Sequence, residues 1–418
     1  MSAPIPVIET APPAEPKFRF SWGWMLIAFA GLILLFAVIR VVTGADDVAS
    51  AGTMGAAVRA AMPIALAGLG GLWAERAGVV NIGLEGMMIL GTFGAGFAGY
   101  QWGPWAALIF ALFMGSIGGL IHAIATVGFG VDHIVSGVAV NIIGLGAAQY
   151  LADLSFTGKP GGGPTQSPPV ERMPTFDVPV ISELARDLGG SGVFFLSDLG
   201  RVVAGLTTRV SVLTVIGLAL IIGTWYLLWR TTFGLRVRAC GENPQSAETL
   251  GINVYLYKYS AVIVSGAMAG LGGAFLVDDA SVYRDGQTGG RGYIGLAAMI
   301  FGNWRPGGML AGAGLFGFTD ALRLRRGGES VHALLLFVGI ALLVLAVWML
   351  WRRRVLQGVL SVVFGLGFVV FYATTDTMPA DFTGMTPFIT TLLVLALASQ
   401  TLRMPKADGQ RYRRGQAG

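Results

Sequence analysis

The residues best suited to recognition chemistry gather in one polar segment, residues 234–252, between two long apolar segments. Its sequence, GLRVRACGENPQSAETLGI, mixes charged, amide and small side chains. An Asn-Pro pair at 243–244 can start a helix and Gly251 can end one, so we expect a short helix over 245–250 and a turn at Gly241. Such a helix offers a surface to another protein. An ordinary solvated loop is the alternative.

A second set of candidates lies inside apolar sequence, where ionisable and amide side chains are costly and often functional. Glu85 lies about one helical turn after Asn81 in an expected helix over 78–99, so the two could share a face. They would line a substrate pathway or, as we favour for Glu85, have a packing or hinge role near the charged pair at 75–76. Asn141 could face the same pathway or hydrogen-bond another helix.

The motifs of common catalytic sites are missing from the sequence. The Gly-Lys pair at 158–159 is followed by Pro160 and is not part of a G-x-x-x-x-G-K-[ST] phosphate loop, so we expect no ATP hydrolysis by this chain alone. The three histidines are scattered without metal-ligand spacing. We therefore expect no catalytic residues, no metal site and no cofactor bound by this chain. The histidines are His122, His133 and His332.

The composition is that of an integral membrane protein. Hydrophobic residues make up 54% of the 418 residues, charged residues 12%, and the mean hydropathy is +0.69, whereas an average soluble domain has roughly 25% charged residues. Because a spanning helix needs roughly 20 mainly apolar residues, the sequence predicts an all-α polytopic protein with about 10–12 spans. Two of these, 287–302 and 307–322, are short and joined by 303–306, so we expect broken or re-entrant elements there. The candidates are 22–43, 56–73, 78–99, 104–128, 134–153, 209–229, 256–276, 287–302, 307–322, 331–351, 355–374 and 384–402.

A faint internal repeat links two distant parts of the chain. The Ala-Gly-Leu-Gly-Gly of 67–71 recurs at 269–273, and the Ile-Gly-Leu-x-x-Met of 82–87 recurs at 294–299. The paired copies run in opposite directions in the expected topology, which predicts an inverted repeat, an arrangement common in transport folds. Chance is the alternative, because glycine-rich apolar sequence produces such matches readily.

Four glycines have the spacing of a helix-packing motif. Gly115 and Gly119, and likewise Gly266 and Gly270, are separated by three residues. This small-xxx-small pattern lets two membrane helices approach closely. We expect these glycines to pack helices together.

Basic residues orient the spans, because short basic loops stay in the cytoplasm. Clusters within 230–258, 352–354 and 406–414 all fall on the cytoplasmic side if both termini lie there. The cluster at 323–326 falls on the opposite side and disagrees with this topology. The net charge of +5 is explained by this bias, and we expect no nucleic acid partner.

The topology divides the chain into three parts. We predict a disordered cytoplasmic tail over 1–20, a transmembrane domain over 21–402 and a cytoplasmic basic tail over 403–418. Within the transmembrane domain, residues 154–208 form an extracytoplasmic loop with a short amphipathic helix at 181–189, and residues 230–256 form a cytoplasmic loop around the polar segment.

Three motifs resemble those of one transporter family. The polar segment fits G-L-R-x-R-A-x-G-E-N-P-x-x-A-x-x-x-G-I, residues 75–87 read ERAGVVNIGLEGM, and residues 290–302 read GRGYIGLAAMIFG. They are similar to motifs of permease subunits of bacterial ABC importers in the branched-chain amino acid, ribose and nucleoside group, especially its nucleoside and simple-sugar branch. The chain is longer than is usual for that group in 154–208 and 331–375.

The resemblance implies a transport system with separate roles. A substrate-binding protein outside the membrane delivers the substrate, two permeases, expected to be a heterodimer, form the pathway in the lipid of the bacterial inner membrane, and cytoplasmic ABC ATPase subunits bind ATP and Mg²⁺. Residues 21–402 would be the permease domain, and the polar segment its contact with the ATPase. The residues implied for this contact are Gly241, Glu242, Asn243, Gln245, Glu248, Leu250 and Gly251.

The cargo is left open between related classes. The resemblance puts nucleosides first and simple sugars such as ribose second. A self-sufficient ion-coupled secondary transporter is a further alternative, but the sequence lacks the series of intramembrane acids that such carriers commonly use. A membrane scaffold that transports nothing is the remaining alternative.

Overall fold

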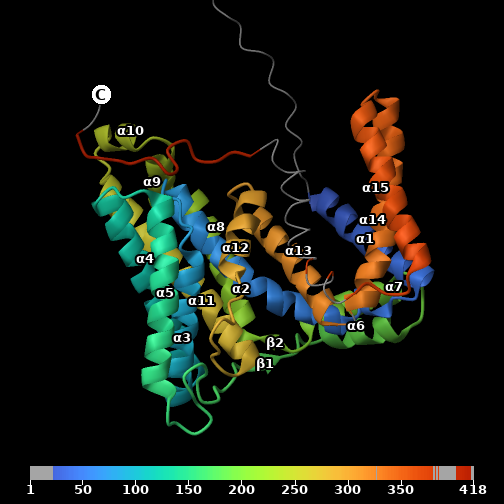
Figure 1. Cartoon of the computed structure of the whole chain (residues 1–418), viewed down its shortest axis with the longest axis horizontal. Coiled ribbons are helices and arrows are strands. Elements are labelled where there is room, and N and C mark those ends of the chain that lie inside the picture. Colours follow the sequence, from blue (N-terminus) through green and yellow to red (C-terminus); the bar gives the residue numbers. More distant parts are fainter. Residues whose placement is uncertain (1–21, 326, 380–381, 383–384, 386–401, 416–418) are drawn as a thin grey trace, which may run out of the picture.

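The computed structural model describes residues 22–325, 327–379, 382, 385 and 402–415. In these residues the chain is a bundle of helices with one pair of two-residue strands (Figure 1). Seven of the described helices are long and apolar enough to cross a membrane, so the chain is an all-α polytopic membrane protein, as predicted. The tail expected over 1–20 lies outside the described residues, and the span expected over 384–402 lies almost wholly outside them.

Most of the long described helices lie where apolar stretches predicted spans, with shifted ends. The seven candidate spans are α2 (Ala51–Arg76), α4 (Pro104–Ala123) with a π-helical turn (Ile124–Gly128), α5 (His133–Phe156), α8 (Val212–Arg230), α11 (Val254–Ala280), α14 (Gly327–Trp351) and α15 (Val355–Thr374). The other elements are α1 (Trp22–Thr43), a 3₁₀ turn (Asp46–Ala49), α3 (Leu84–Trp102), β1 (Thr175–Phe176), α6 (Ile181–Gly190), α7 (Leu196–Thr207), β2 (Val210–Ser211), α9 (Thr232–Glu242), α10 (Pro244–Thr249), α12 (Arg291–Phe301) and α13 (Pro306–Leu324).

Two long helices, α2 and α11, cross antiparallel at the centre of the bundle and carry the two copies of the repeated pentapeptide. A Cβ added to Gly70 would lie 2.4 Å from the Ser265 carbonyl oxygen, and one added to Gly272 would lie 2.9 Å from that of Pro63, so the two backbones touch. The helices that follow exchange partners: α3 and α4 pack on α11, whereas α12 and α13 pack on α2. This exchange is the contact pattern of an inverted repeat, as the sequence predicted.

Each copy of the repeat contains a break. A non-helical stretch over 77–83 separates α2 from α3, and one over 281–290 separates α11 from α12. Gly78 has φ +79°, a backbone conformation that a right-handed helix does not contain, and α3 begins only after this stretch. The prediction that Asn81 lies in the same helix as Glu85 is therefore wrong.

The glycine motifs of α4 and α11 pack against each other. A Cβ added to Gly115 would lie 2.2 Å from the Gly266 carbonyl oxygen, and one added to Gly270 would lie 2.3 Å from that of Ala111. Such distances leave no room for a side chain, so the backbones of the two helices are in direct contact. The structural role predicted for these glycines is confirmed.

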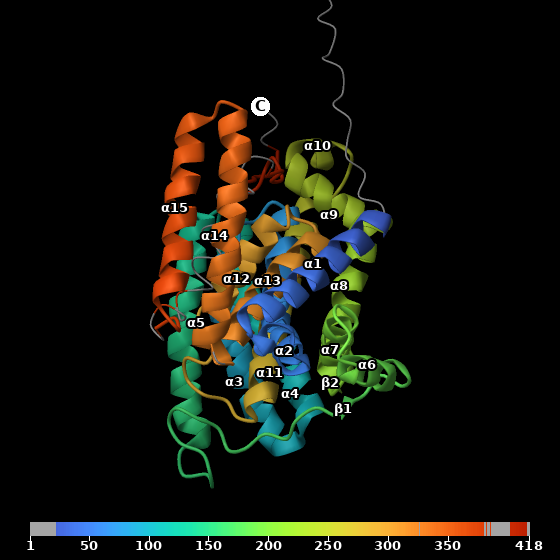
Figure 2. The ribbon, with the colours of Figure 1, turned by 90° about the vertical axis from the view of Figure 1, so that its right-hand side faces the viewer.

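The two ends of the bundle carry different elements, as Figures 1 and 2 show. α9, α10 and residues 402–415 lie together at one end, and α6, α7, β1 and β2 lie at the other. The amphipathic helix expected at 181–189 is present as α6. The two loops predicted to face opposite sides of the membrane thus lie at opposite ends, and which end is cytoplasmic stays a prediction.

Candidate functional site

The helix predicted in the polar segment is present as α10, with the expected ends. The Asn243 side chain accepts a hydrogen bond from the Ser246 N–H (2.9 Å), and Pro244 occupies the first turn. Gly251 follows the helix with φ +77°. An amide cap, a proline at the start and a glycine at the end are favoured at these positions because they satisfy or avoid free backbone groups.

Gly241 lies inside α9 and not in the predicted turn. A Cβ added to it would lie 2.3 Å from the Arg76 carbonyl oxygen and 3.0 Å from the Gly78 nitrogen. A glycine is therefore needed here because α9 touches the end of α2, not because the chain turns. This contact joins the polar segment to the first break of the inverted repeat.

One side of α10 is buried and the other is exposed. Pro244 and Ala247 are buried, and Ala247 packs with Cys240 and Val254. On the exposed side the leucine at position 250 is 80% exposed, which adds an apolar contact to a polar surface. This arrangement suits contact with another protein. The exposed residues predicted for that contact are Glu242, Asn243, Gln245, Leu250 and Gly251.

Two acids predicted to face a partner contact the chain's own tail segment, which we define as residues 402–415. The Lys406 N–H donates to Glu242 Oε2 (3.4 Å), and the Gly415 N–H donates to Glu248 Oε2 (3.5 Å). Arg414 Nε lies 3.6 Å from Glu248 Oε1. Sequence reasoning missed these contacts, although the acids of the polar segment and the bases of the tail segment were predicted on the same side of the membrane.

The buried side of α9 holds the single cysteine of the chain. Cys240 is fully buried, and this burial raises the pKa of its thiol to about 11. The thiol is therefore protonated and unreactive near neutral pH. Nearby, Arg238 Nε donates to the Leu228 carbonyl (2.9 Å) and its guanidinium lies 5.8 Å from the centre of the Trp229 ring. These contacts hold α9 against the end of α8.

Glu85 lies at a second site, where the start of α3 meets the start of α12. We call this site, made by Glu85, Asn141, Tyr293 and residues 290–292, the junction. The Gly290 N–H donates to Glu85 Oε1 (2.9 Å) and the Gly292 N–H donates to Oε2 (2.7 Å). The first N–H groups of a helix lack intrahelical partners and carry partial positive charge, so a carboxylate stabilises them. Both oxygens of Glu85 are used inside the chain, which supports the packing role that we favoured.

The two amides predicted with Glu85 also hold this region together. Asn141 Oδ1 accepts from the Gly86 N–H (2.7 Å), and its Nδ2 donates to the Tyr293 hydroxyl (2.9 Å). Asn81 is fully buried and its Nδ2 donates to the Ser265 hydroxyl (2.8 Å). The structure therefore brings all three residues to the start of α3. A role for them in the substrate pathway stays a prediction.

Charged residues beside the junction form ion pairs. Arg291 pairs with Asp320 (Nη2 to Oδ2, 3.1 Å), and Asp320 also pairs with Arg323 (2.9 Å). The motif at 290–302 was a signal for Arg291, but its partner lies in another helix. No group of three or more His, Cys, Asp and Glu within the described part of the chain could hold a metal ion.

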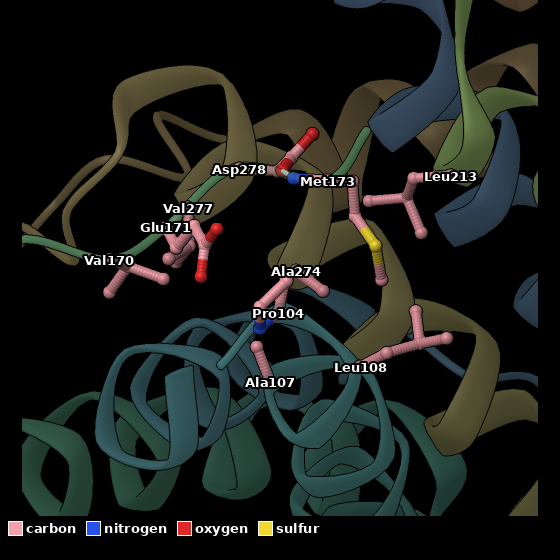
Figure 3. A pocket seen from close by; sticks show the side chains of 10 residues that line it. All are labelled: Pro104, Ala107, Leu108, Val170, Glu171, Met173, Leu213, Ala274, Val277 and Asp278. Atoms are coloured by element: carbon pink, nitrogen blue, oxygen red, sulfur yellow. Dashed lines mark hydrogen bonds between the residues drawn. The ribbon is translucent and has the colours of Figure 1, made fainter. Parts of the chain in front are cut away.

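Two neighbouring cavities lie toward the end that carries α6 and α7. The smaller one, of about 10 Å³, has room for about one water molecule (Figure 3). At its edge Asp278 Oδ1 accepts from the Met173 N–H (2.6 Å), which fastens the end of α11 to the segment before β1. The larger cavity, of about 410 Å³, is lined by both polar and apolar residues, among them the ion pair of Arg59 and Asp279 (3.3 Å). Its size suits a small polar molecule.

Comparison with known sequences identifies one protein family. The family described as "Branched-chain amino acid transport system / permease component" matches residues 53–347. No solved structure matches the chain significantly.

Three named relatives are similar to the chain. The guanosine ABC transporter permease protein NupQ of Bacillus subtilis is 38% identical over 63% of this chain and 79% of its own length. The nucleoside ABC transporter permease protein NupC of Lactococcus lactis is 31% identical over 84% of this chain and 93% of its own length. A putative glucose ABC transporter permease protein of Haloferax volcanii, TsgC13, is 33% identical over 66% of this chain and 78% of its own length.

Proposed function

The chain belongs to the family of branched-chain amino acid transport system permease components, and on this basis we propose that it is the membrane-spanning permease subunit of an ABC importer that takes up nucleosides. It would work by alternating access, with the energy supplied by separate ATPase subunits. The multi-pass helical fold and the inverted repeat are features common among membrane transporters and support this role.

The similarity to two nucleoside permeases carries this proposal. One of them, NupC, is matched over 93% of its length, so the likeness extends through nearly the whole transport domain. Simple sugars are the second candidate cargo, because the glucose permease TsgC13 is matched at similar identity. The polar cavity of about 410 Å³ would accept either kind of molecule.

The polar segment is the proposed point of contact with the ATPase. Its exposed side, from Glu242 to Gly251, would dock on the ATPase surface, and ATP and Mg²⁺ would bind to that partner and not to this chain. The end that carries α9, α10 and the tail segment would then be cytoplasmic, and residues 154–208 would face a substrate-binding protein outside the bacterial inner membrane. A second, different permease chain would complete the pathway.

Uptake by a reconstituted complex tests the proposal. The chain, its partner permease and the ATPase are placed in proteoliposomes with ATP on the ATPase side and the binding protein on the other. We expect ATP-dependent uptake of labelled guanosine that unlabelled nucleosides compete with and that ribose and glucose do not.

Two other outcomes would contradict it. Uptake that sugars inhibit and nucleosides do not would assign the chain to sugar transport. Uptake by vesicles that contain this chain alone, driven by an ion gradient and indifferent to ATP, would make it a secondary carrier.

A further inference from the structure

The tail segment, residues 402–415, is packed against the bundle beside the polar segment. In Figure 1 it is the red coil that runs along the end of the bundle that carries α9 and α10, and it contains no regular helix or strand. Two of its side chains are almost fully enclosed, Ala407 at 4% exposure and Asp408 at 8%. A basic tail held near the membrane only by its charge would not bury an alanine and an acid. The tail segment therefore packs at a defined site on the bundle, which we call its seat.

One part of this binding site for the tail segment is formed by α9, α10 and the start of α11. The Ala407 N–H donates to the Gly241 carbonyl (2.9 Å) in α9. The Tyr412 ring lies 5.4 Å from the Tyr255 ring of α11, and it packs on the buried cluster that contains Ala247 of α10. The tail segment therefore contacts α9, α10 and the start of α11 together.

The other part of the seat is formed by the turn after α2 and the turn after α12. The Ala407 carbonyl oxygen would lie 3.1 Å from a Cβ on Gly78, in the break that follows α2. At the other turn, the Arg403 N–H donates to Asn303 Oδ1 (2.7 Å). These turns belong to opposite copies of the inverted repeat, so the tail segment bridges the two copies.

A direct bond between the turns completes the arrangement. The Trp304 indole N–H donates to Glu75 Oε2 (2.5 Å), and Arg76 Nη2 donates to the Trp304 carbonyl (2.6 Å). Asp408 of the tail segment lies against Glu75. Both Asp408 oxygens are buried without a hydrogen-bond donor among the described residues, and a proton held between the Asp408 and Glu75 carboxyl groups would satisfy one of them.

We propose that the tail segment is a tie that transmits movement of α9 and α10 to the turns after α2 and α12, and so positions both broken helices during transport. This inference rests on the proposed function, because it assigns a route from the ATPase contact to the membrane domain. A ligand or partner shifts a conformational equilibrium only through contacts that differ between its states. The tie supplies a contact that reaches both copies of the repeat at once.

The first experiment separates coupling from assembly. Tyr412→Ala removes the ring that packs on Tyr255, and Asp408→Ala removes the buried carboxyl group. We expect both variants to copurify with the ATPase and to keep its basal hydrolysis, while the number of molecules transported per ATP falls roughly tenfold, within the usual range of coupling between two sites. Asp408→Asn, which can still share a hydrogen with Glu75, should keep most of this ratio.

The control is Arg413→Ala. Arg413 follows Tyr412 directly in the tail segment. Its side chain is exposed and forms no ion pair within the described residues. It should match the wild type in every measurement. Wild-type transport per ATP in both Tyr412→Ala and Asp408→Ala would overturn the inference, and so would equal losses in the control.

A second measurement does not depend on the cargo. Hydrogen exchange of the purified chain should show faster exchange in Tyr412→Ala than in wild type at residues 77–83 and at 302–305, the two turns that the tie contacts. Unchanged exchange at both turns would overturn the inference even if transport fell. If instead the wild-type complex moves neither nucleosides nor sugars, the proposed function fails, and the exchange result still decides whether the tie exists.

Discussion

The junction and the polar segment both place polar groups in a hydrophobic protein, but they use them differently. At the junction, the Glu85 carboxylate accepts two backbone N–H groups and Asn141 uses both ends of its amide, so these groups are satisfied within the chain. In the polar segment, the Asn243 side chain makes one capping hydrogen bond, while Gln245 and Leu250 remain exposed.

The difference follows from the surroundings of the two sites. A polar group in the membrane interior has no water to replace a missing partner, so it is retained where the chain itself satisfies it. A polar group at the membrane surface can exchange water for a partner protein at little cost. Polar residues at the junction therefore hold the fold, whereas the exposed Gln245 of the polar segment can exchange water for the groups of a partner.

The largest effect is expected at the junction. Glu85→Ala leaves the N–H groups of Gly290 and Gly292 without partners, and because hydrogen bonds to charged groups contribute about 1.5–3 kcal/mol each, we expect the two lost bonds to lower the stability by about 3–6 kcal/mol. Thermal unfolding in detergent measures it. The exposed Glu183 of α6 gives the control variant Glu183→Ala, and equal unfolding midpoints for the two variants would show that the junction does not need its carboxylate.

A companion variant sharpens the comparison by separating folding from transport. Glu85→Gln keeps one acceptor oxygen but turns an amide donor toward a backbone donor, so a smaller loss of stability is expected. If Glu85→Gln transports at the wild-type rate with unchanged substrate preference, Glu85 does not belong to the pathway.

The next effect is expected in the polar segment, on coupling rather than on folding. Glu242→Lys combined with Asn243→Trp changes the charge and shape of the docking surface, and we expect substrate-stimulated ATP hydrolysis to fall roughly tenfold. Membrane insertion should stay intact, and only about 1 kcal/mol of local stability should be lost with the helix cap. Glu183→Lys, at the opposite end of the bundle, is the control. Normal stimulation in the double variant would remove the polar segment as the ATPase contact.

A pH effect is expected where Asp408 of the tail segment packs beside the end of α2. Burial raises the pKa of Asp408 from 3.8 to about 7, against the opposing influence of Lys258 and Arg76 and with Glu75 beside it. The seated tail therefore holds a proton that the released tail loses, so seating weakens as the pH rises from about 4 to about 7 and changes little outside this range. Exchange of the Ala407 amide, corrected for its intrinsic pH dependence, measures this. A pH dependence that persists in Asp408→Asn would assign it to another group.

The smallest effect is expected for the exposed ion pair of the tail segment. Arg414 is largely exposed and lies 3.6 Å from Glu248, and such pairs contribute about 0–1 kcal/mol. Arg414→Ala should change the unfolding midpoint by less than Glu85→Gln does, and the small difference should shrink further at high salt. A loss as large as that of Glu85→Ala would erase the distinction between internal and surface polar groups.

Hydropathy was sufficient to predict most of the fold. The apolar stretches anticipated α4, α5, α8, α14 and α15, because long apolar runs have few alternatives to crossing a bilayer. The repeated pentapeptides anticipated the antiparallel crossing of α2 and α11. Hydropathy could not locate the break before α3, because residues 78–83 are as apolar as a helix and only the backbone at Gly78 shows that the helix has ended.

The candidate sites were predicted less completely, since their key contacts join distant parts of the chain. α10 was predicted from Asn243, Pro244 and Gly251, because the residues that cap a helix are adjacent to it in the sequence. The backbone partners of Glu85 lie about 200 residues away, at 290–292, and no local pattern pairs them. The contact of the tail segment with Gly241 could not be predicted either, because these residues are also far apart in the sequence.

The buried thiol of Cys240 has a practical consequence. Because it is fully enclosed and its pKa is raised to about 11, it should not react with maleimide reagents near neutral pH. For site-directed labelling the natural chain is thus already equivalent to one without cysteine. A fluorophore on a new cysteine at position 250 and a second at position 413 could report, in an otherwise native sequence, how α10 and the tail segment move during a transport cycle.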